Sequence, residues 1–160
     1  MGTKAPTTAA TAALTRFGIP YIAHPFDHAA GSQRYGPEAA SALGVPAERV
    51  FKTLVVTAGD RLAVAITPVS GSLDLRAVAA ALGAKRSVLA DPAVAERRTG
   101  SVVGGISPLG QREPLPTLLD ASAADHPTIF VSGGRRGFDI ELTPADLLRA
   151  TDARLVAIAR

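Results

Sequence analysis

The 160-residue sequence contains no cysteine and no tryptophan, and it has only five phenylalanines and two tyrosines. The absence of cysteine excludes disulfide bonds, a thiolate nucleophile and a cysteine-ligated zinc site, and it is typical of a cytoplasmic protein. The longest apolar stretches, such as Leu62–Val69, fall far short of the roughly 20 residues that a membrane-spanning helix needs. The residues around Lys4 do not form the apolar segment of a signal peptide. We therefore expect a cytoplasmic protein with no part in a membrane.

The residues that are present describe one ordinary domain. Hydrophobic residues make up 47% of the chain but aromatics only 4%, so alanine, valine, leucine and isoleucine must build most of the core. A chain of 160 residues can bury such a core without disulfides or metals. No repeat or linker divides the chain, so we treat residues 1–160 as a single domain. The formal charge of +3 is compatible with a polyanionic partner but does not establish one.

Predicted helices and strands follow one another irregularly. Capping residues or prolines ahead of apolar residues at helical spacing predict helices after Thr8, from Pro37, and after Asp74, Asp91 and Thr143. Strands are predicted at Tyr21–His24, Phe51–Thr57, Arg61–Thr67, Thr117–Asp120, Thr128–Ser132, Phe138–Leu142 and Leu155–Ala159. A turn at Ala58–Asp60 makes the second and third of these strands a hairpin. Hairpin-joined strands with interspersed helices indicate an α+β fold and not a regular βαβ array.

Lys52 is the first residue with two competing interpretations. It follows Phe51 at the start of a predicted strand, on the same side as Leu54 and Val56. A lysine at a strand end commonly covers apolar neighbours with its aliphatic stem and keeps its charge in water. It can equally be a cation at the mouth of a pocket, placed to hold a phosphate or a developing negative charge. The local sequence leaves both open.

Two glycine-rich segments are candidates for contact with an anion. In Val103–Gly110, three glycines and a proline bracket Ser107, and glycine lets backbone N–H groups approach a ligand closely. A tight structural turn is the simpler explanation. Ser132–Gly137 joins two predicted strands and contains Arg135 and Arg136, which are either solvated hairpin residues or phosphate contacts. It is not a P-loop, because a strand and not a helix follows it.

Other groups of polar residues in the sequence do not indicate a metal site or a catalytic triad. His24 and His28 are four residues apart, but Pro25 makes a helix through them improbable, so we do not expect a metal site. There is no G-x-S-x-G motif, and a Ser-His-Asp hydrolase is not indicated. Asp139 alternates with apolar residues and shares a face with Glu141, which is most often the solvent face of an edge strand.

Taken in order, these segments resemble the YbaK/EbsC family of tRNA-editing proteins, and most closely its branch of Cys-tRNA(Pro) deacylases. The likeness covers nearly the whole chain. It is carried by Phe51–Leu54, Ala63–Pro68, Leu73–Leu75, Ala81–Lys85, Ala90–Pro92, Thr99–Gly100, Val103–Gly110, Leu115–Thr117, Thr128–Gly137 and Asp139–Leu142.

The resemblance implies a mixed, barrel-like sheet of six or seven strands surrounded by helices. It also implies the release of a misattached amino acid from the 3′ end of a mischarged tRNA, with no metal and no other cofactor. A prolyl-tRNA synthetase bound to the same tRNA is the second partner that it suggests.

The resemblance also assigns roles to residues of this sequence. Lys52 takes the position of the family's key lysine and would contact the terminal phosphate or ribose. The backbone of Gly104 and Gly105 would stabilise the carbonyl oxygen or oxyanion of the ester. Asp139 would bind the α-ammonium group of the substrate or a ribose hydroxyl. Ser132 would position the aminoacyl group.

Further assignments concern the pocket walls and the tRNA backbone. Thr53 and Pro108 match pocket-lining positions, and Arg135 and Arg136 are the candidate phosphate contacts. Many relatives carry a tyrosine where Phe26 stands in this sequence. The loss of that hydroxyl is expected to relax the choice of substrate.

In the deacylases that the sequence resembles, the thiol of the substrate attacks its own ester carbonyl, so the protein needs no nucleophile of its own. That chemistry suits a sequence without cysteine, a metal motif or a catalytic triad. Two alternatives stay open. One is a deacylase that uses water to clear another small amino acid, as in Ala-tRNA(Pro). The other is an inactive tRNA-binding adaptor, against which the retention of Lys52, both glycines and Asp139 speaks.

Overall fold

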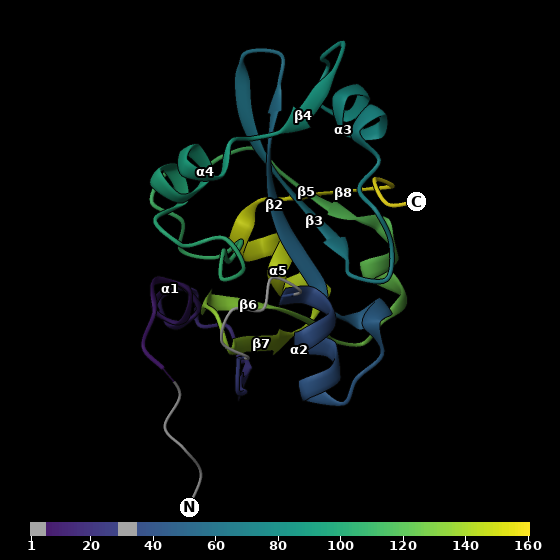
Figure 1. Cartoon of the computed structure of the whole chain (residues 1–160). Helices are drawn as coiled ribbons and strands as arrows, with labels where there is room; N and C mark the ends of the chain where they lie inside the picture. Colours follow the sequence, from purple (N-terminus) through teal and green to yellow (C-terminus); the bar gives the residue numbers. More distant parts are fainter. Residues whose placement is uncertain (1–5, 29–34) are drawn as a thin grey trace, which may run out of the picture.

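The structure, a computed structural model, describes residues 6–28 and 35–160 (Figure 1). The helices in these ranges are α1 (Ala9–Phe17), α2 (Tyr35–Leu43), α3 (Leu75–Ala81), α4 (Pro92–Thr99) and α5 (Pro144–Thr151), with short 3₁₀ helices η1 (Ala47–Arg49) and η2 (Ala121–Asp125). The strands are β1 (Ile22–Pro25), β2 (Phe51–Ala58), β3 (Arg61–Pro68), β4 (Ser87–Leu89), β5 (Thr117–Asp120), β6 (Ile129–Arg135), β7 (Phe138–Leu142) and β8 (Arg154–Val156). The α+β class predicted from the sequence is confirmed.

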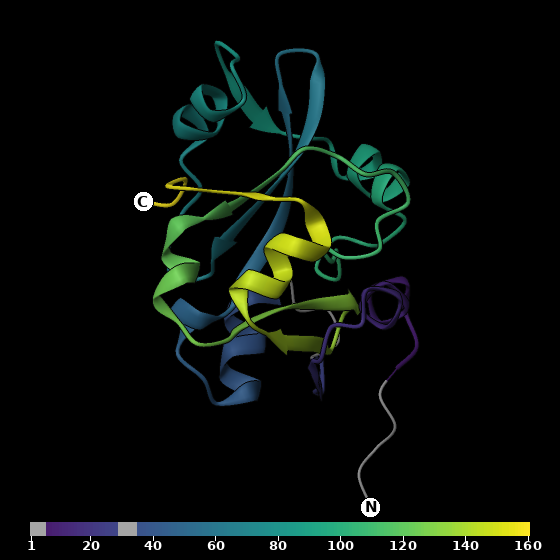
Figure 2. The same ribbon diagram turned by 180° about the vertical axis from the view of Figure 1, so that it is seen from behind.

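The strands form two sheets. The larger one has the order β4-β2-β3-β5-β8 and is mixed, because β5 runs parallel to both β3 and β8. The smaller one has the order β1-β7-β6 and is antiparallel. A parallel bridge between Val50 and Phe130 joins the two sheets where β2 begins. Helix α2 covers one side of this assembly and α5 the opposite side, as the two views show (Figures 1 and 2). The mixed sheet with surrounding helices that the resemblance implied is present, with its strands arranged as two sheets joined by the bridge between Val50 and Phe130.

The two faces of the smaller sheet have different surroundings. Alternate residues of β6 and β7, among them Val131, Phe138 and Ile140, are buried in the main core with residues of α1 and α5. The opposite face carries Phe130, which packs against the alanines of α2, and also Ser132 and Asp139. The prediction that Asp139 lies on the solvent face of an edge strand is wrong, because β1 pairs with the outer side of β7 and makes β7 the central strand.

The β2–β3 hairpin has the predicted turn and a continuous antiparallel register from Phe51–Pro68 to Ala58–Arg61. Lys52 shares a face with Leu54 and Val56, as predicted, and Val56 packs against Val78 of α3. On the other face, Val55 packs against Ala95 of α4 and against Ile106. The hairpin therefore connects the core to the segment that follows α4.

Local capping chemistry sets the predicted helix starts. The side chains of Thr8, Asp74, Asp91 and Thr143 each accept a hydrogen bond from a backbone N–H in the first turn of the helix that follows. Helix α2 begins at Tyr35, two residues before the predicted start at Pro37. No helix in the described ranges has the length and apolar character needed to cross a bilayer.

Three strands differ from the predictions, namely β4 and β8 of the larger sheet and β6 of the smaller one. Strand β4 was not predicted, because it has three residues and depends on its pairing with β2. Strand β6 continues past the predicted end at Ser132, through an irregularity in register, to Arg135. Strand β8 ends before the predicted Ala159, because the N–H groups of Ile158 and Ala159 donate to the Asp120 carboxylate.

Candidate functional site

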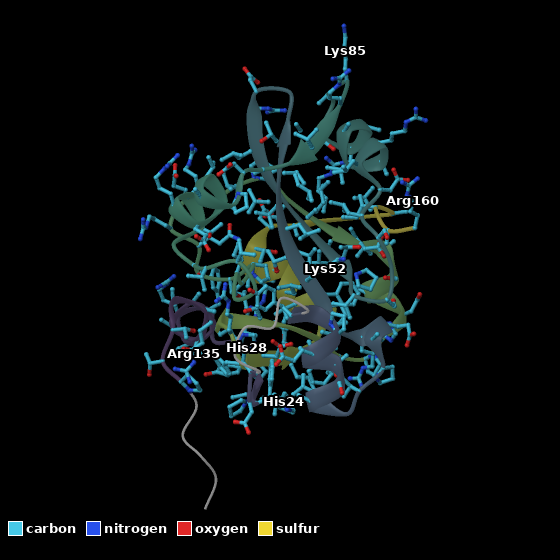
Figure 3. All side chains as sticks on the ribbon, in the orientation of Figure 1. His24, His28, Lys52, Lys85, Arg135 and Arg160 are labelled. Atoms are coloured by element: carbon cyan, nitrogen blue, oxygen red, sulfur yellow. The ribbon has the colours of Figure 1, made fainter. Side chains whose placement is uncertain are left out.

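A cavity of about 450 Å³ lies between α2, β2, α4 and the segment 103–106. Its walls are mainly apolar, with a few polar groups from distant parts of the sequence, the usual composition of a ligand site. Five of the ten predicted site residues line it, namely Lys52, Thr53, Gly104, Ser132 and Asp139. Figure 3 shows Lys52 in the middle of the molecule, well away from Lys85, which projects from the upper end.

Asp139 is the most unusual polar group in the cavity. It lies opposite His24 of β1 and opposite Ser132 of β6, and it is only 7% exposed. No donor in the described ranges is hydrogen-bonded to its carboxylate, since the His24 ring lies 2.9 Å from Glu141 Oε1 instead. Burial raises the pKa of Asp139 from 3.8 to about 7. A buried carboxyl group without donors suits a cationic or hydrogen-bonding ligand.

Ser132 lies next to Asp139, just before a bulge in β6. The bulge depends on Gly133, where an added Cβ would lie 2.3 Å from the Phe138 ring. The Gly134 N–H donates to Ser132 Oγ at 3.2 Å. Thr8 Oγ1 donates to the carbonyl of Gly133 at 2.6 Å and ties the bulge to α1. The serine hydroxyl is thus oriented as an acceptor toward the bulge, and its own hydrogen is available to a ligand.

Lys52 and Thr53 each contribute a polar group that has few hydrogen-bond partners within the described part of the protein. Lys52 is half-buried, and its Nζ lies 3.5 Å from the carbonyl oxygen of Gly71, with no carboxylate paired to it among the residues described. The hydroxyl of Thr53 is buried and has no hydrogen-bond partner among residues 6–28 and 35–160. A lysine without a counter-ion at a cavity wall favours the pocket interpretation over the exposed strand-end one.

The two glycines of the 103–106 segment differ in what their amides do. Gly104 lines the cavity in a left-handed conformation with φ of 90°, and its N–H has no acceptor in the described part of the chain. The Gly105 N–H donates to the carbonyl of Val102 at 2.9 Å. A Cβ on Gly105 would lie 2.7 Å from the backbone of Arg135 and Arg136, so this glycine serves close packing. Of these two amides, only that of Gly104 has no acceptor among the described residues, so it is the one available to a ligand.

The other predicted residues lie beside the cavity and do not line it. Phe26 packs in the cluster around Phe130, and its N–H donates to the Gly137 carbonyl at 2.8 Å. Pro108 is buried in the turn that follows the glycines. Arg135 and Arg136 are exposed at the turn between β6 and β7.

The two histidines that suggested a metal site bind different carboxylates. His24 contacts Glu141, whereas His28 Nδ1 lies 3.0 Å from Glu38 Oε2. Within residues 6–28 and 35–160, no three histidine or acidic side chains gather in a metal-binding arrangement. The two rings therefore do not converge on a common point.

Residues 34–150 match the model of the aminoacyl-tRNA editing domain family, a span that contains all five cavity residues discussed above. The chain belongs to this family. The resemblance to tRNA-editing proteins noted in the sequence is thereby confirmed.

Two curated relatives and two solved structures extend this result. EbsC of Enterococcus faecalis, named as a candidate Cys-tRNA(Pro)/Cys-tRNA(Cys) deacylase, is 38% identical over 74% of this chain and 73% of its own length. The uncharacterised YwhH of Bacillus subtilis is 31% identical over 69% of this chain and 70% of its own. A candidate trans-editing enzyme for prolyl tRNA synthetase superposes with a TM-score of 0.82 at 25% identity, over 98% and 99% of the two chains. A hypothetical protein, at 22% identity and a TM-score of 0.86 over 96% and 100% of the chains, shares the fold.

One residue of this editing-domain cavity was missed from the sequence. Tyr35, the first residue of α2, lines the cavity, and its ring packs directly on Gly104. A tyrosine ahead of Gly36 and Pro37 has no local signature of a binding residue. Its rarity was the only signal, since the chain has just two tyrosines.

Proposed function

We propose that this protein is a trans-editing deacylase that clears Cys-tRNA(Pro), and also Cys-tRNA(Cys), by substrate-thiol-assisted release. The observation that carries the proposal is the single cavity that gathers Lys52, the open Gly104 amide, Ser132 and the donor-free Asp139. Neither Ser132 nor Thr53 has a histidine bonded to its hydroxyl in the described ranges. A site of this kind suits a reaction whose nucleophile comes from the substrate.

The proposed reaction exchanges one bond for another. The thiol sulfur of the cysteinyl group attacks the ester carbonyl carbon, and the bond from that carbon to the ribose oxygen breaks. The thiol proton ends on the released ribose oxygen, and the products are a small thiolactone and free tRNA. The Gly104 N–H stabilises the oxyanion that forms on the carbonyl oxygen. The thiolactone then reacts with water to give cysteine.

The remaining polar groups position the substrate in this scheme. The Asp139 carboxylate binds the α-ammonium group of the cysteinyl ester, and this cation in turn favours the ionised form of a carboxyl group whose pKa is about 7 in the free protein. Lys52 binds the phosphate or ribose of the terminal nucleotide. Ser132 holds the aminoacyl group. The names of EbsC and of the trans-editing structure support cysteine and proline tRNA as the substrate class.

A deacylation panel tests this function. Purified protein is mixed with tRNAs carrying cysteine, serine, alanine or proline, and the remaining aminoacyl ester is measured over time. We expect turnover of Cys-tRNA(Pro) and loss of turnover when serine replaces cysteine, because a hydroxyl is a much weaker nucleophile than a thiol. Lys52→Ala should lower kcat/KM by about 100-fold and leave the circular dichroism spectrum unchanged.

Three results would count against the proposal. Equal rates on Ser- and Cys-tRNA would replace thiol assistance with water attack. A preference for Ala-tRNA(Pro) would keep the fold and the site but change the substrate. No deacylation of any tRNA in the panel would favour an adaptor that binds tRNA without releasing the amino acid.

A further inference from the structure

The Tyr35 ring holds together three segments of chain at the edge of the cavity. The His28 ring stacks on it, with 5.6 Å between ring centroids and an interplanar angle of 27°. The Arg136 guanidinium lies 4.9 Å from the centre of the same ring. Gly104 lies so close that an added Cβ would be 2.6 Å from a ring carbon. We call Tyr35, His28, Gly104 and Arg136 the aromatic clasp.

Arg136 makes a second contact that closes the clasp. Its Nε donates to the carbonyl oxygen of Val103 at 2.9 Å, one residue before Gly104. One guanidinium therefore lies on the Tyr35 ring and is also hydrogen-bonded to the segment that packs on this ring. A planar guanidinium does both while stacking on the ring, whereas a lysine ammonium would contact the ring only as a compact point charge.

The neighbouring arginine has a different environment. Arg135 is exposed, and its side chain has no hydrogen bond or ion pair with any residue in the described ranges. Its label lies close to that of His28 in Figure 3, on the side of the molecule where the turn between β6 and β7 lies. The two arginines are equivalent in the sequence, yet one is engaged within the protein and the other points to solvent.

We propose that Arg136 is a positioning residue that acts through Tyr35 on Gly104, and that Arg135 is the one of the two arginines that contacts the tRNA backbone. This inference rests on the proposed deacylase function. The clasp holds the Val103–Gly104 peptide beside the cavity, with Gly104 in its left-handed conformation. Without Arg136, the Tyr35 ring and this peptide lose a common partner, and the amide is less often in the orientation that stabilises the oxyanion.

Single-turnover kinetics separate the two arginines. Arg136→Ala should lower the rate constant at saturating Cys-tRNA(Pro) by about 10-fold, with less than a twofold change in the concentration for half-saturation. Arg135→Ala should instead raise that concentration several-fold, and its effect should fade as salt is added. Arg136→Lys should recover only a small part of the lost rate, since it restores the charge without the planar contact.

The absence of tryptophan allows a second measurement that needs no activity. In a Tyr21→Phe background, Tyr35 is the only intrinsic fluorophore of practical use. Acrylamide quenching of its emission should rise by about twofold on Arg136→Ala, because one face of the ring loses its cover. Arg135→Ala should leave the quenching constant unchanged.

The outcomes are distinguishable. If Arg136→Ala raises the half-saturation concentration in a salt-dependent way and leaves the saturated rate intact, Arg136 is a phosphate contact and the inference is wrong. Unchanged quenching in Arg136→Ala would equally overturn the clasp. If the parent protein deacylates no tRNA, the proposed function fails, while the clasp is still decided by the quenching of Tyr35.

Discussion

Asp120 and Asp139 are both buried aspartates on sheet strands, with exposures of 4% and 7%. Asp120, at the end of β5, accepts hydrogen bonds from the N–H groups of Ile158 and Ala159 and from the N–H and hydroxyl of Ser122. Asp139, the second residue of β7, accepts none from any residue described. Burial raises the pKa of Asp120, but its hydrogen bonds more than offset this and hold the pKa below 3.8. Burial alone raises that of Asp139 to about 7.

This difference in hydrogen bonding indicates that Asp120 stabilises the folded chain, whereas Asp139 does not. Two of the donors to Asp120 are the backbone N–H groups of Ile158 and Ala159, so its charge ties the C-terminal segment to the larger sheet. The donors that Asp139 lacks are the ones that a ligand in the cavity would bring. A buried acidic group left without partners costs stability, and such a cost is common at functional sites.

The largest effect on stability is expected at Asp120. Asp120→Ala leaves the N–H groups of Ile158 and Ala159 without their acceptor, and it should lower the free energy of unfolding by about 4 kcal/mol. Urea denaturation monitored by circular dichroism measures this loss. The folded fraction should keep its kcat/KM for deacylation. A loss below about 1 kcal/mol would show that Asp120 is no more structural than Asp139.

The converse experiment is Asp139→Asn, which keeps the shape and removes the charge. If Asp139 binds the α-ammonium group, kcat/KM for Cys-tRNA(Pro) should fall about 100-fold, equivalent to about 2.7 kcal/mol of transition-state stabilisation. The fold should be retained, as a thermal melt would show. Asp60→Asn, in the exposed hairpin turn, is the matched control and should retain the parent kcat/KM. Retained activity in Asp139→Asn would remove Asp139 from the site.

The dependence of stability on pH provides a third test. The pKa of Asp139 in the folded chain, about 7, lies above the ordinary value of 3.8, so between these values the unfolded chain loses the proton that the folded chain keeps. The free energy of unfolding therefore falls as the pH rises through this range. Relative to Asp139→Asn, the parent protein should lose about 2 kcal/mol between pH 5 and pH 8.

Urea titrations at pH 5, 6, 7 and 8 measure that difference. The same series on Asp120→Asn should show a constant difference from the parent, because the folded-state pKa of Asp120 is lowered and its contribution is lost only as the pH falls below the ordinary value of 3.8. Parallel stability curves for the parent and Asp139→Asn would contradict the raised pKa.

The local sequence predicts much of the fold but not this contrast. Capping residues and apolar spacing fix the helix starts, and the Ala58–Asp60 turn fixes the β2–β3 hairpin. Asp120 follows two leucines and Asp139 lies between Phe138 and Ile140, so both read as polar residues in apolar strands. Besides the nearby Ser122, the donors to Asp120 come from 38 and 39 residues away. Which aspartate receives donors is decided by tertiary structure.

The same limit applies to the site. The family resemblance named Lys52, Ser132 and Asp139, but only the structure gathers them around one cavity. The role of Tyr35 depends on contacts with Gly104 and Arg136 that have no trace in the sequence around it. Phe26 was expected in the pocket wall, and in the described structure it packs beside the cavity instead. The sequence therefore predicted several residues of the site, but it did not predict which side chains contact one another there.

The smallest expected effect extends the comparison from carboxylates to hydroxyls. The hydroxyls of Thr53 and Thr67 are both buried without a hydrogen-bond partner in the described part of the chain, but only Thr53 lines the cavity. Replacing either threonine with valine removes an unsatisfied polar group at constant shape, so each variant should gain about 1 kcal/mol of stability in urea denaturation.

Activity should distinguish the two. Thr53→Val should lower kcat/KM several-fold, because a hydroxyl that has no partner in the free protein is available to the aminoacyl group or the ribose. Thr67→Val should change stability without such a loss, because Thr67 is fully buried and does not line this cavity. Equal losses of activity in both variants would mean that the threonines act through the packing of β2 on β3, and the polar groups of the site would then reduce to Lys52, Ser132 and Asp139.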